Sequence, residues 1–299
     1  MITAHPGLPE FDYIWPESLI EASKFLADHP GEAIPFMGGT DIFVRMRDGF
    51  IKSKYLVDVK CLEESDRITF DPEAGLSLGA AVNMNRVIAS PEIQQVYPLL
   101  SEAAHTVASY QLRTRATVVG NLCNASPAGD TTGACVVLDG TLLVHGVDGF
   151  RTESLKTFFL GPGKTRLKPG DIVRAIQFPL PPPGYSARYY KLGRNASGDL
   201  AIVGVTVLGF PDDSAPSGYR FRIALASVAP VPLVPLEAEK ILTNEPITPE
   251  NITKAARAAM DACNPISDVR GSARYRKLMV RNLTEKLIRE VWQKIGNGR

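Results

Sequence analysis

The segment 111–130, with the sequence QLRTRATVVGNLCNASPAGD, constrains what this chain can fold into more than any other. It gathers small polar residues and chain-reversing positions around a short apolar centre and ends on Asp130. A core strand does not need this composition. A site where backbone N–H groups approach a phosphate does need it, because glycine permits close approach and unusual dihedrals. The alternative interpretation is a tight turn between two buried strands, since short Gly/Asn motifs often occur without a ligand.

A second stretch of the same kind, 33–41 with the sequence AIPFMGGTD, lies far away in the chain. An apolar run leads into Gly38 and Gly39, and Thr40 and Asp41 follow, which is typical of a strand, a glycine turn and a polar tip. Two such loops could close on the two sides of one diphosphate. Neither fits GxGxxG or GxxxxGK[ST], so the sequence indicates neither a Rossmann site nor a P-loop.

These residues carry a resemblance to a known family. Both loops resemble those of the FAD-binding medium subunit of the molybdenum hydroxylases, the family of carbon monoxide dehydrogenase and xanthine dehydrogenase. The first is similar to that family's AGGT[DE] loop, and the second to its AT[IV]GGN…ASP…D segment. Further stretches resemble the family in the same order, namely 172–179, 190–194, 199–203, 229–232 and 265–272. The likeness covers nearly the whole chain, from about Phe11 to Leu287.

The order of elements predicts an α+β fold, because antiparallel strands are followed by helices in the second half. The Pro-Pro-Pro-Gly run at 181–184 marks a boundary that neither a strand nor a helix can cross. The resemblance implies a two-lobed FAD-binding domain of the vanillyl-alcohol-oxidase/PCMH type over 1–180, with lobes at about 1–60 and 61–180. It also implies a C-terminal domain of the CO dehydrogenase flavoprotein type over 185–299, an antiparallel sheet packed by helices.

Local patterns predict the individual elements. A capping box at Ser18 and Glu21 indicates a helix that ends near His29, and apolar spacing indicates another over 98–108. The remaining expected elements are strands at 55–59, 76–80 and 172–178, a hairpin formed by 134–138 and 141–144, strands at 187–192, 200–210 and 219–228, and helices at 236–242, from 248, and at 272–295.

The resemblance implies that the cofactor is FAD, with its diphosphate held by the backbones of Met37–Asp41 and Thr117–Asn121. Thr40, Thr117 and Asn121 would add side-chain donors, and an uncharged nest would satisfy the phosphate oxygens. The residues expected at the cofactor are Pro35, Phe36, Met37, Gly38, Gly39, Thr40, Asp41, Ile42, Thr117, Val118, Val119, Gly120, Asn121, Asp130, Val173 and Lys191.

Three of these positions have specific expected roles and ordinary alternatives. Asp130 would accept hydrogen bonds from cofactor hydroxyls, or simply form a turn beside Gly129. Lys191 lies where the family has a basic residue near the flavin ring, where a cation would stabilise negative charge on the reduced flavin and raise its potential. Its alternative is a solvent-facing lysine on a strand edge. Val173 would pack on the ring, or be an ordinary core valine.

Two positions depart from the family pattern. The family has Gly-Gly in the second loop, where this chain has Val119 and Gly120. A β-branched residue does not readily adopt positive φ, so we expect that position to be extended or the loop to be distorted. After Arg194 the family commonly has a second arginine, and Asn195 stands here.

Composition excludes several classes of function. The net charge of +1 gives no field that favours nucleic acid, and no apolar run is long enough to span a membrane. The residues 1–11 lack the pattern of a signal peptide, and the 4 cysteines show no CxxC pairing, so we expect a cytoplasmic chain without a metal site or iron–sulfur cluster of its own. Arg113, Arg115 and the basic residues of 270–281 are interpreted as solvated faces available to a partner.

The resemblance therefore implies an oxidoreductase subunit with no catalytic residues for the substrate. It would pass electrons from the [2Fe–2S] clusters of a small partner through FAD to an external acceptor. A large partner would hold molybdopterin, and the complex would be a heterohexamer, a dimer of heterotrimers. Two alternatives remain open at this point, a non-flavin assembly subunit and a free-standing flavin oxidase. The sequence identifies neither the substrate nor the acceptor.

Overall fold

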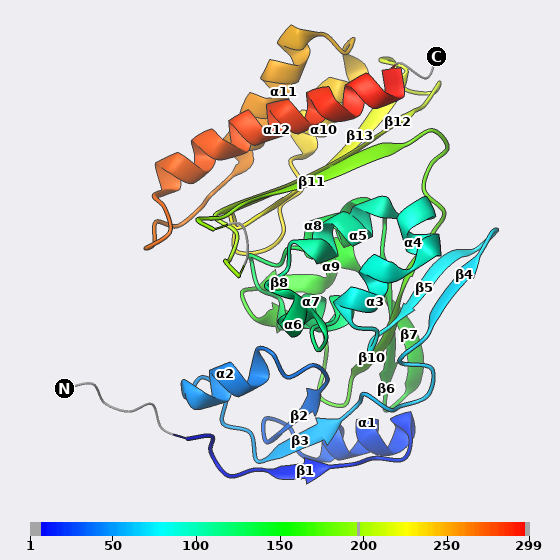
Figure 1. Ribbon diagram of the computed structural model, residues 1–299, viewed down its shortest axis with the longest axis vertical. Helices are drawn as coiled ribbons and strands as arrows, with labels where there is room; N and C mark the ends of the chain where they lie inside the picture. Colours follow the sequence, from blue (N-terminus) through cyan, green and yellow to red (C-terminus); the bar gives the residue numbers. More distant parts are fainter. Residues whose placement is uncertain (1–6, 196–197, 297–299) are drawn as a thin grey trace.

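The computed structural model describes residues 7–195 and 198–296. The positions 1–6 at the start of the N-terminal segment discussed above lie outside that description, as do 196–197 and 297–299. Figure 1 shows a molecule built from parts stacked along its long axis. The N-terminal lobe (blue) is at the bottom, the second lobe (cyan to green) is in the middle, and the C-terminal sheet with its helices (yellow-green to red) is at the top.

The N-terminal lobe contains a small parallel sheet. Its strands are β1 (Asp12–Ile14), β2 (Ala33–Phe36) and β3 (Tyr55–Asp58), in the order β1–β3–β2. The helix α1 (Leu19–Asp28) connects β1 to β2, and α2 (Ile42–Arg47) connects β2 to β3. The Ser18 hydroxyl caps α1 by accepting from the N–H of Glu21 at 3.1 Å, as the capping box predicts.

The second lobe is built on an antiparallel sheet in the order β4–β5–β10–β6–β7. These strands are β4 (Ile68–Asp71), β5 (Gly75–Gly79), β6 (Thr141–Gly146), β7 (Gly149–Ser154) and β10 (Ile172–Phe178). Helices cover it: α3 (Met84–Ala89), α4 (Pro91–Val96), α5 (Pro98–His105), α6 (Tyr110–Arg113), α7 (Val118–Asn124), α8 (Thr132–Val137) and α9 (Leu155–Phe158). A short ribbon of β8 (Phe159–Gly161) and β9 (Lys164–Thr165) completes the lobe.

The predicted hairpin of 134–138 with 141–144 is wrong. The first of these segments lies almost entirely in the helix α8, and β6 pairs instead with β7 through the turn at Val147 and Asp148. Every residue of α8 is buried, so no polar face reveals the helical period in the sequence. A Cβ on Gly133 would stand 2.3 Å from the Thr206 hydroxyl oxygen, which shows how closely α8 packs on the C-terminal sheet.

The C-terminal sheet is antiparallel in the order β11–β12–β13, with strands β11 (Ser186–Leu192), β12 (Val203–Pro211) and β13 (Tyr219–Ala226). Helices α5 and α8 of the second lobe pack on this sheet, as do α10 (Leu236–Asn244) and α12 (Ala273–Gly296), and α11 (Pro249–Ala262) packs between the last two. Figure 1 shows the sheet between these two groups of helices. The buried side chains of this sheet therefore belong to two hydrophobic cores. One core includes the helices of the second lobe, and the other includes the C-terminal helices.

Two arginines that the sequence places on solvated faces are buried, so that prediction is wrong for them. Arg113 is 7% exposed, and its guanidinium donates to the carbonyls of His105 and Val107 at 3.1 and 2.8 Å. Arg276 is 1% exposed and pairs with Asp268 at 2.7 Å. Each guanidinium is buried because carbonyl or carboxylate oxygens accept its donors. In the part of the chain that the structure describes, no helix is both long and apolar enough to cross a membrane.

Candidate functional site

A cavity of about 480 Å³ lies between the two lobes of the first half and reaches the β11–β12 connection of the C-terminal part. This is the size range of small-molecule and cofactor pockets. It brings together most residues that the sequence predicts at a cofactor: Pro35, Met37, Gly38, Gly39, Thr40, Asp41, Ile42, Thr117, Val119, Gly120, Asn121, Asp130 and Val173. The other predicted residues, Phe36, Val118 and Lys191, do not line it.

The first glycine stretch forms a turn between β2 and α2. Gly38 lies against the second lobe: a Cβ there would stand 2.3 Å from the Arg115 carbonyl oxygen. Gly39 has φ of +74°, and a Cβ on it would meet the Phe36 ring at 2.7 Å. Both glycines are therefore required by the backbone itself, one for close approach and one for the left-handed conformation.

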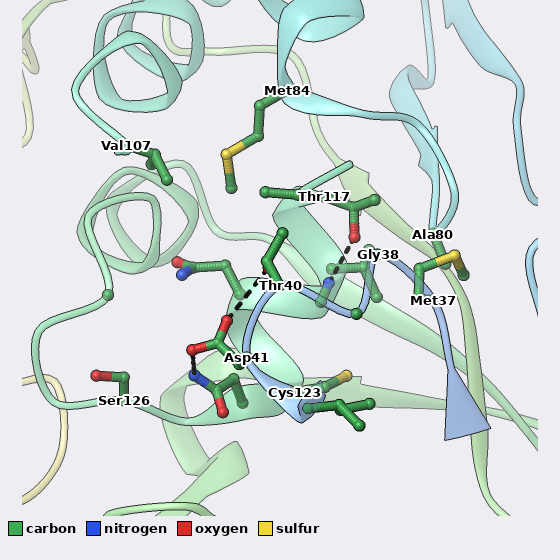
Figure 2. A pocket seen from close by; sticks show the side chains of 18 of the residues that line it. Met37, Gly38, Thr40, Asp41, Ala80, Met84, Val107, Thr117, Cys123 and Ser126 are labelled. Atoms are coloured by element: carbon green, nitrogen blue, oxygen red, sulfur yellow. Dashed lines mark hydrogen bonds between the residues drawn. The ribbon is translucent and has the colours of Figure 1, made fainter. Parts of the chain in front are cut away.

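Three residues of this turn line the cavity and have backbone donors without an acceptor among the described residues. The backbone N–H groups of Gly39, Thr40 and Asp41 make no hydrogen bond within residues 7–195 and 198–296. The carboxylate of Asp41 accepts from the Asn124 amide at 3.1 Å, which joins the two lobes across the cavity (Figure 2). Backbone N–H groups that line a cavity without an internal acceptor suit an anionic ligand such as a phosphate.

The second glycine stretch is the beginning of a helix and not a loop or a turn between strands. Thr117 is the N-cap of α7, and its hydroxyl accepts from the N–H of Gly120 at 2.9 Å (Figure 2). Val119 lies in the first turn of that helix and is buried. The expectation of an extended residue or a distorted loop at Val119 is therefore wrong, because a helical position needs no positive φ and accepts a β-branched residue.

Asp130 is held by the C-terminal part of the chain. Its carboxylate accepts from the Tyr189 hydroxyl at 2.7 Å and pairs with the Lys191 ammonium at 2.8 Å. Lys191 also donates to the Thr106 carbonyl at 3.0 Å, and its side chain is only 11% exposed. The alternative of a solvent-facing lysine is therefore wrong, and Lys191 lies behind the cavity wall that Asp130 forms.

Burial dominates the ionisation of this cluster. It raises the pKa of Asp130 even though Lys191 and Tyr189 act to lower it. Burial, together with the neighbouring Asp130, raises the pKa of Tyr189 well above its ordinary value, so the phenol is a hydrogen-bond donor at neutral pH. Both oxygens of Asp130 are therefore engaged within the protein, and its expected contact with cofactor hydroxyls stays a prediction.

The remaining wall of the cavity is largely apolar. Val173 on β10 is 6% exposed and lines the cavity, at an irregularity in the pairing of β10 with β6 between Val173 and Ala175. Figure 2 shows Met84 and Val107 on one side of the cavity, with Thr40 and Asp41 of the turn opposite them. A polar end and an apolar remainder match a ligand with a phosphate part and an aromatic part.

Sequence reasoning did not place five polar residues of the cavity wall at the cofactor, namely Arg45, Asn124, Ser126, Asp171 and Asp199. Arg45 follows the glycine turn by one helical turn, and Asn124 lies inside the conspicuous segment 111–130, so their positions gave a usable signal. Asp171 gave none, because its ionic partner Arg151 is 20 residues away in the sequence. Burial alone would raise the pKa of Asp171, but hydrogen bonds from Arg151 and from the Lys168 N–H hold that pKa below its ordinary value.

The residues present fit a flavin dinucleotide. Unpaired backbone N–H groups suit a diphosphate, and the apolar wall suits the flavin ring system. A two-lobed domain with its cavity between the lobes, joined to a third sheet at the cavity's far end, defines a cofactor-binding flavoprotein scaffold.

Comparison with known proteins names the family. Residues 9–181 match the FAD-binding domain in molybdopterin dehydrogenase, and residues 188–291 match the CO dehydrogenase flavoprotein C-terminal domain. The chain belongs to the family of FAD-binding medium subunits of molybdopterin dehydrogenases and is an oxidoreductase subunit. Its cofactor is FAD, and the α+β prediction is confirmed.

Individual relatives agree with this assignment over nearly full length. The chain is 30% identical to the carbon monoxide dehydrogenase medium chain of Hydrogenophaga pseudoflava, over 95% of this chain and 98% of that protein. It is 28% identical to a putative xanthine dehydrogenase FAD-binding subunit of Escherichia coli, over 91% of this chain and 93% of that one.

Solved structures agree as well. A carbon monoxide dehydrogenase from H. pseudoflava lacking the Mo-pyranopterin moiety of its cofactor matches with a TM-score of 0.90 and 30% identity, covering 96% of this chain and 98% of that one. Quinoline 2-oxidoreductase from Pseudomonas putida 86 matches with a TM-score of 0.88 and 25% identity, covering 97% of this chain and 99% of that one.

Proposed function

We propose that this chain holds FAD between its two N-terminal lobes and passes electrons from the [2Fe–2S] clusters of a small partner chain to an external acceptor. The observation that carries the proposal is the cavity shared by the turn at Gly38–Asp41 and the start of α7 at Thr117. FAD supplies the redox chemistry when bound. The chain's own residues bind it, orient it and shield it from water.

Each part of the cavity has a proposed task. The N–H groups of Gly39, Thr40 and Asp41 bind the diphosphate, and Val173 packs against the flavin ring. Asp130 orients the cofactor through its hydroxyls, while Lys191 holds Asp130 in place and adds positive charge behind the wall. A cation near the flavin ring would favour the reduced flavin electrostatically, and the low exposure of the Asp130–Lys191 pair limits screening by water.

We propose the partner subunits of this chain from the kinds of subunit that its relatives are. These relatives are a medium chain and an FAD-binding subunit of dehydrogenases, which supports one large molybdopterin chain and one small [2Fe–2S] chain as partners here. We propose a dimer of heterotrimers in the cytoplasm, with domains at 1–180 and 185–299. Molybdopterin and iron–sulfur clusters belong to the partner chains in this proposal.

Electron transfer can be tested with purified components. The chain loaded with FAD is mixed anaerobically with the reduced small partner in a stopped-flow spectrometer. We expect the flavin absorption to bleach, and we expect no bleaching when a cluster-free small partner replaces the reduced one. Rapid turnover of a small substrate by the chain alone would contradict the proposal and indicate a free-standing oxidase. A complex that assembles without flavin would indicate an assembly subunit.

A further inference from the structure

The charged residues that line the cavity differ in whether they have an ion-pair partner. Three of the lining carboxylates have basic partners: Asp130 pairs with Lys191, Asp171 with Arg151, and Asp199 with Arg194. Arg45 is the only lysine, arginine or histidine among the described residues that line the cavity. The cavity therefore has a single cationic side chain of its own within that part of the chain.

Arg45 has no carboxylate partner in residues 7–195 and 198–296. Its recorded side-chain hydrogen bond is a long one, from Nη1 to the Asn124 side-chain oxygen at 3.4 Å. The amide of the same Asn124 donates to Asp41 at 3.1 Å, so Asn124 stands between the carboxylate and the guanidinium. A half-buried guanidinium with one weak acceptor retains donors for a ligand.

The position of Arg45 relates it to the diphosphate end of the cavity. It is on α2, which begins directly after the turn whose N–H groups lack acceptors. Asn124 is the last residue of α7, and its hydrogen bond to Asp41 places it beside that turn. A guanidinium forms charge-assisted hydrogen bonds to phosphate oxygens and can do so through two parallel donors.

We propose that Arg45 is a specificity-determining residue that donates to a phosphate of the adenosine diphosphate half of FAD, with Asn124 positioning its guanidinium. This inference rests on the proposed function, because it assumes that FAD occupies the cavity. It differs from the expectation of an uncharged nest, since one positive charge would join the backbone donors. It also predicts that the chain distinguishes a dinucleotide from riboflavin, which carries no phosphate.

The test measures dissociation constants of the full chain for FAD, ADP and riboflavin, by quenching of flavin fluorescence and by competition. The variant is Arg45→Gln, and the matched control is Arg47→Gln, which removes an exposed arginine from the same helix outside the cavity. We expect Arg45→Gln to weaken FAD and ADP roughly 10- to 100-fold, the usual range for a lost charge-assisted hydrogen bond, and to leave riboflavin within about 2-fold. Arg47→Gln should change none of the three.

Salt dependence and a lysine variant test the charge of Arg45 separately. The affinity of the natural chain for ADP should fall as salt rises, and that dependence should be weaker in Arg45→Gln, because one ion pair is missing. Arg45→Lys should keep part of the ADP affinity, since it keeps the charge and loses the two parallel donors.

The possible failures are distinct. If the natural chain binds FAD and ADP, and Arg45→Gln binds each of them with the affinity of the natural chain, the inference is overturned and the proposed function stands. An equal loss of affinity for riboflavin and for ADP in Arg45→Gln would also overturn the inference, because the variant would then have damaged the whole cavity. A folded natural chain that binds neither FAD nor ADP would overturn both proposals.

Discussion

The two glycine-bearing stretches of the cavity look alike in sequence and are physically different. In the first, Gly38 touches the backbone of the other lobe and Gly39 has positive φ, so the turn depends on glycine. In the second, a helix starts at Thr117, and Val119 stands where the family has glycine without any strain. The comparison teaches that a glycine is indispensable only where the local backbone leaves no room for a Cβ.

Gly38→Ala tests the first stretch and should have the largest effect. The new Cβ would meet the Arg115 carbonyl, and neither backbone can move aside without separating the lobes. We expect the free energy of unfolding to fall by about 3 kcal/mol, the upper part of the range for overpacked sites, and FAD binding to fall with it. Urea unfolding and flavin fluorescence measure the two effects. Gly161→Ala is the control, because a Cβ there meets nothing within 4 Å.

Val119→Gly tests whether the second stretch gains anything from the family's residue. Val119 is 4% exposed and helical, so the change loses buried apolar surface and lowers helix propensity. We expect about 2 kcal/mol of destabilisation from the two effects combined and no gain in FAD affinity. Val119→Ala separates the packing loss from the backbone effect. Tighter FAD binding by Val119→Gly would show that the missing glycine matters to the cofactor.

Thr117→Ala removes the N-cap of α7. The N–H of Gly120 then loses its acceptor at 2.9 Å, and such caps typically contribute about 1 kcal/mol. Thr117→Ser should restore most of this stability, because serine keeps the hydroxyl. Thermal unfolding followed by circular dichroism checks both variants. Equal stability of Thr117→Ala and the natural chain would contradict the assignment of Thr117 as a cap.

Gly120→Ala should have the smallest effect and is the counterpart of Gly38→Ala. Alanine favours the helix, while its Cβ would stand 2.9 Å from the Thr117 hydroxyl and disturb the cap. These contributions offset each other, so we expect the free energy of unfolding to change by less than about 0.5 kcal/mol. Calorimetry of Gly120→Ala beside Gly38→Ala makes the contrast directly. A similar loss of unfolding free energy in the two variants would contradict the proposed difference between the two stretches.

Local chemistry in the sequence was sufficient to predict several elements. The capping box at Ser18, the strand at Ile172–Phe178 and the C-terminal helices all follow from spacing and propensity. Most of the cavity wall was also predictable, since both glycine stretches stand out by composition. These features depend on residues close together in the chain, which is why one sequence reveals them.

The remaining features depend on contacts between distant residues. The Asp130–Lys191 pair joins positions 61 residues apart, and the local sequence around either residue does not predict the pairing. The helix α8 is buried all round, so its period leaves no trace. The parallel pairing of β1, β3 and β2 was not predicted, because short strands show the same pattern in parallel and antiparallel sheets.

The central claim is that the cavity between the lobes holds FAD. It is tested most directly by the visible absorption spectrum of the purified, folded chain after incubation with FAD and gel filtration. We expect flavin absorption bands that remain with the protein and bleach on chemical reduction. A folded chain that emerges colourless from excess FAD would contradict it.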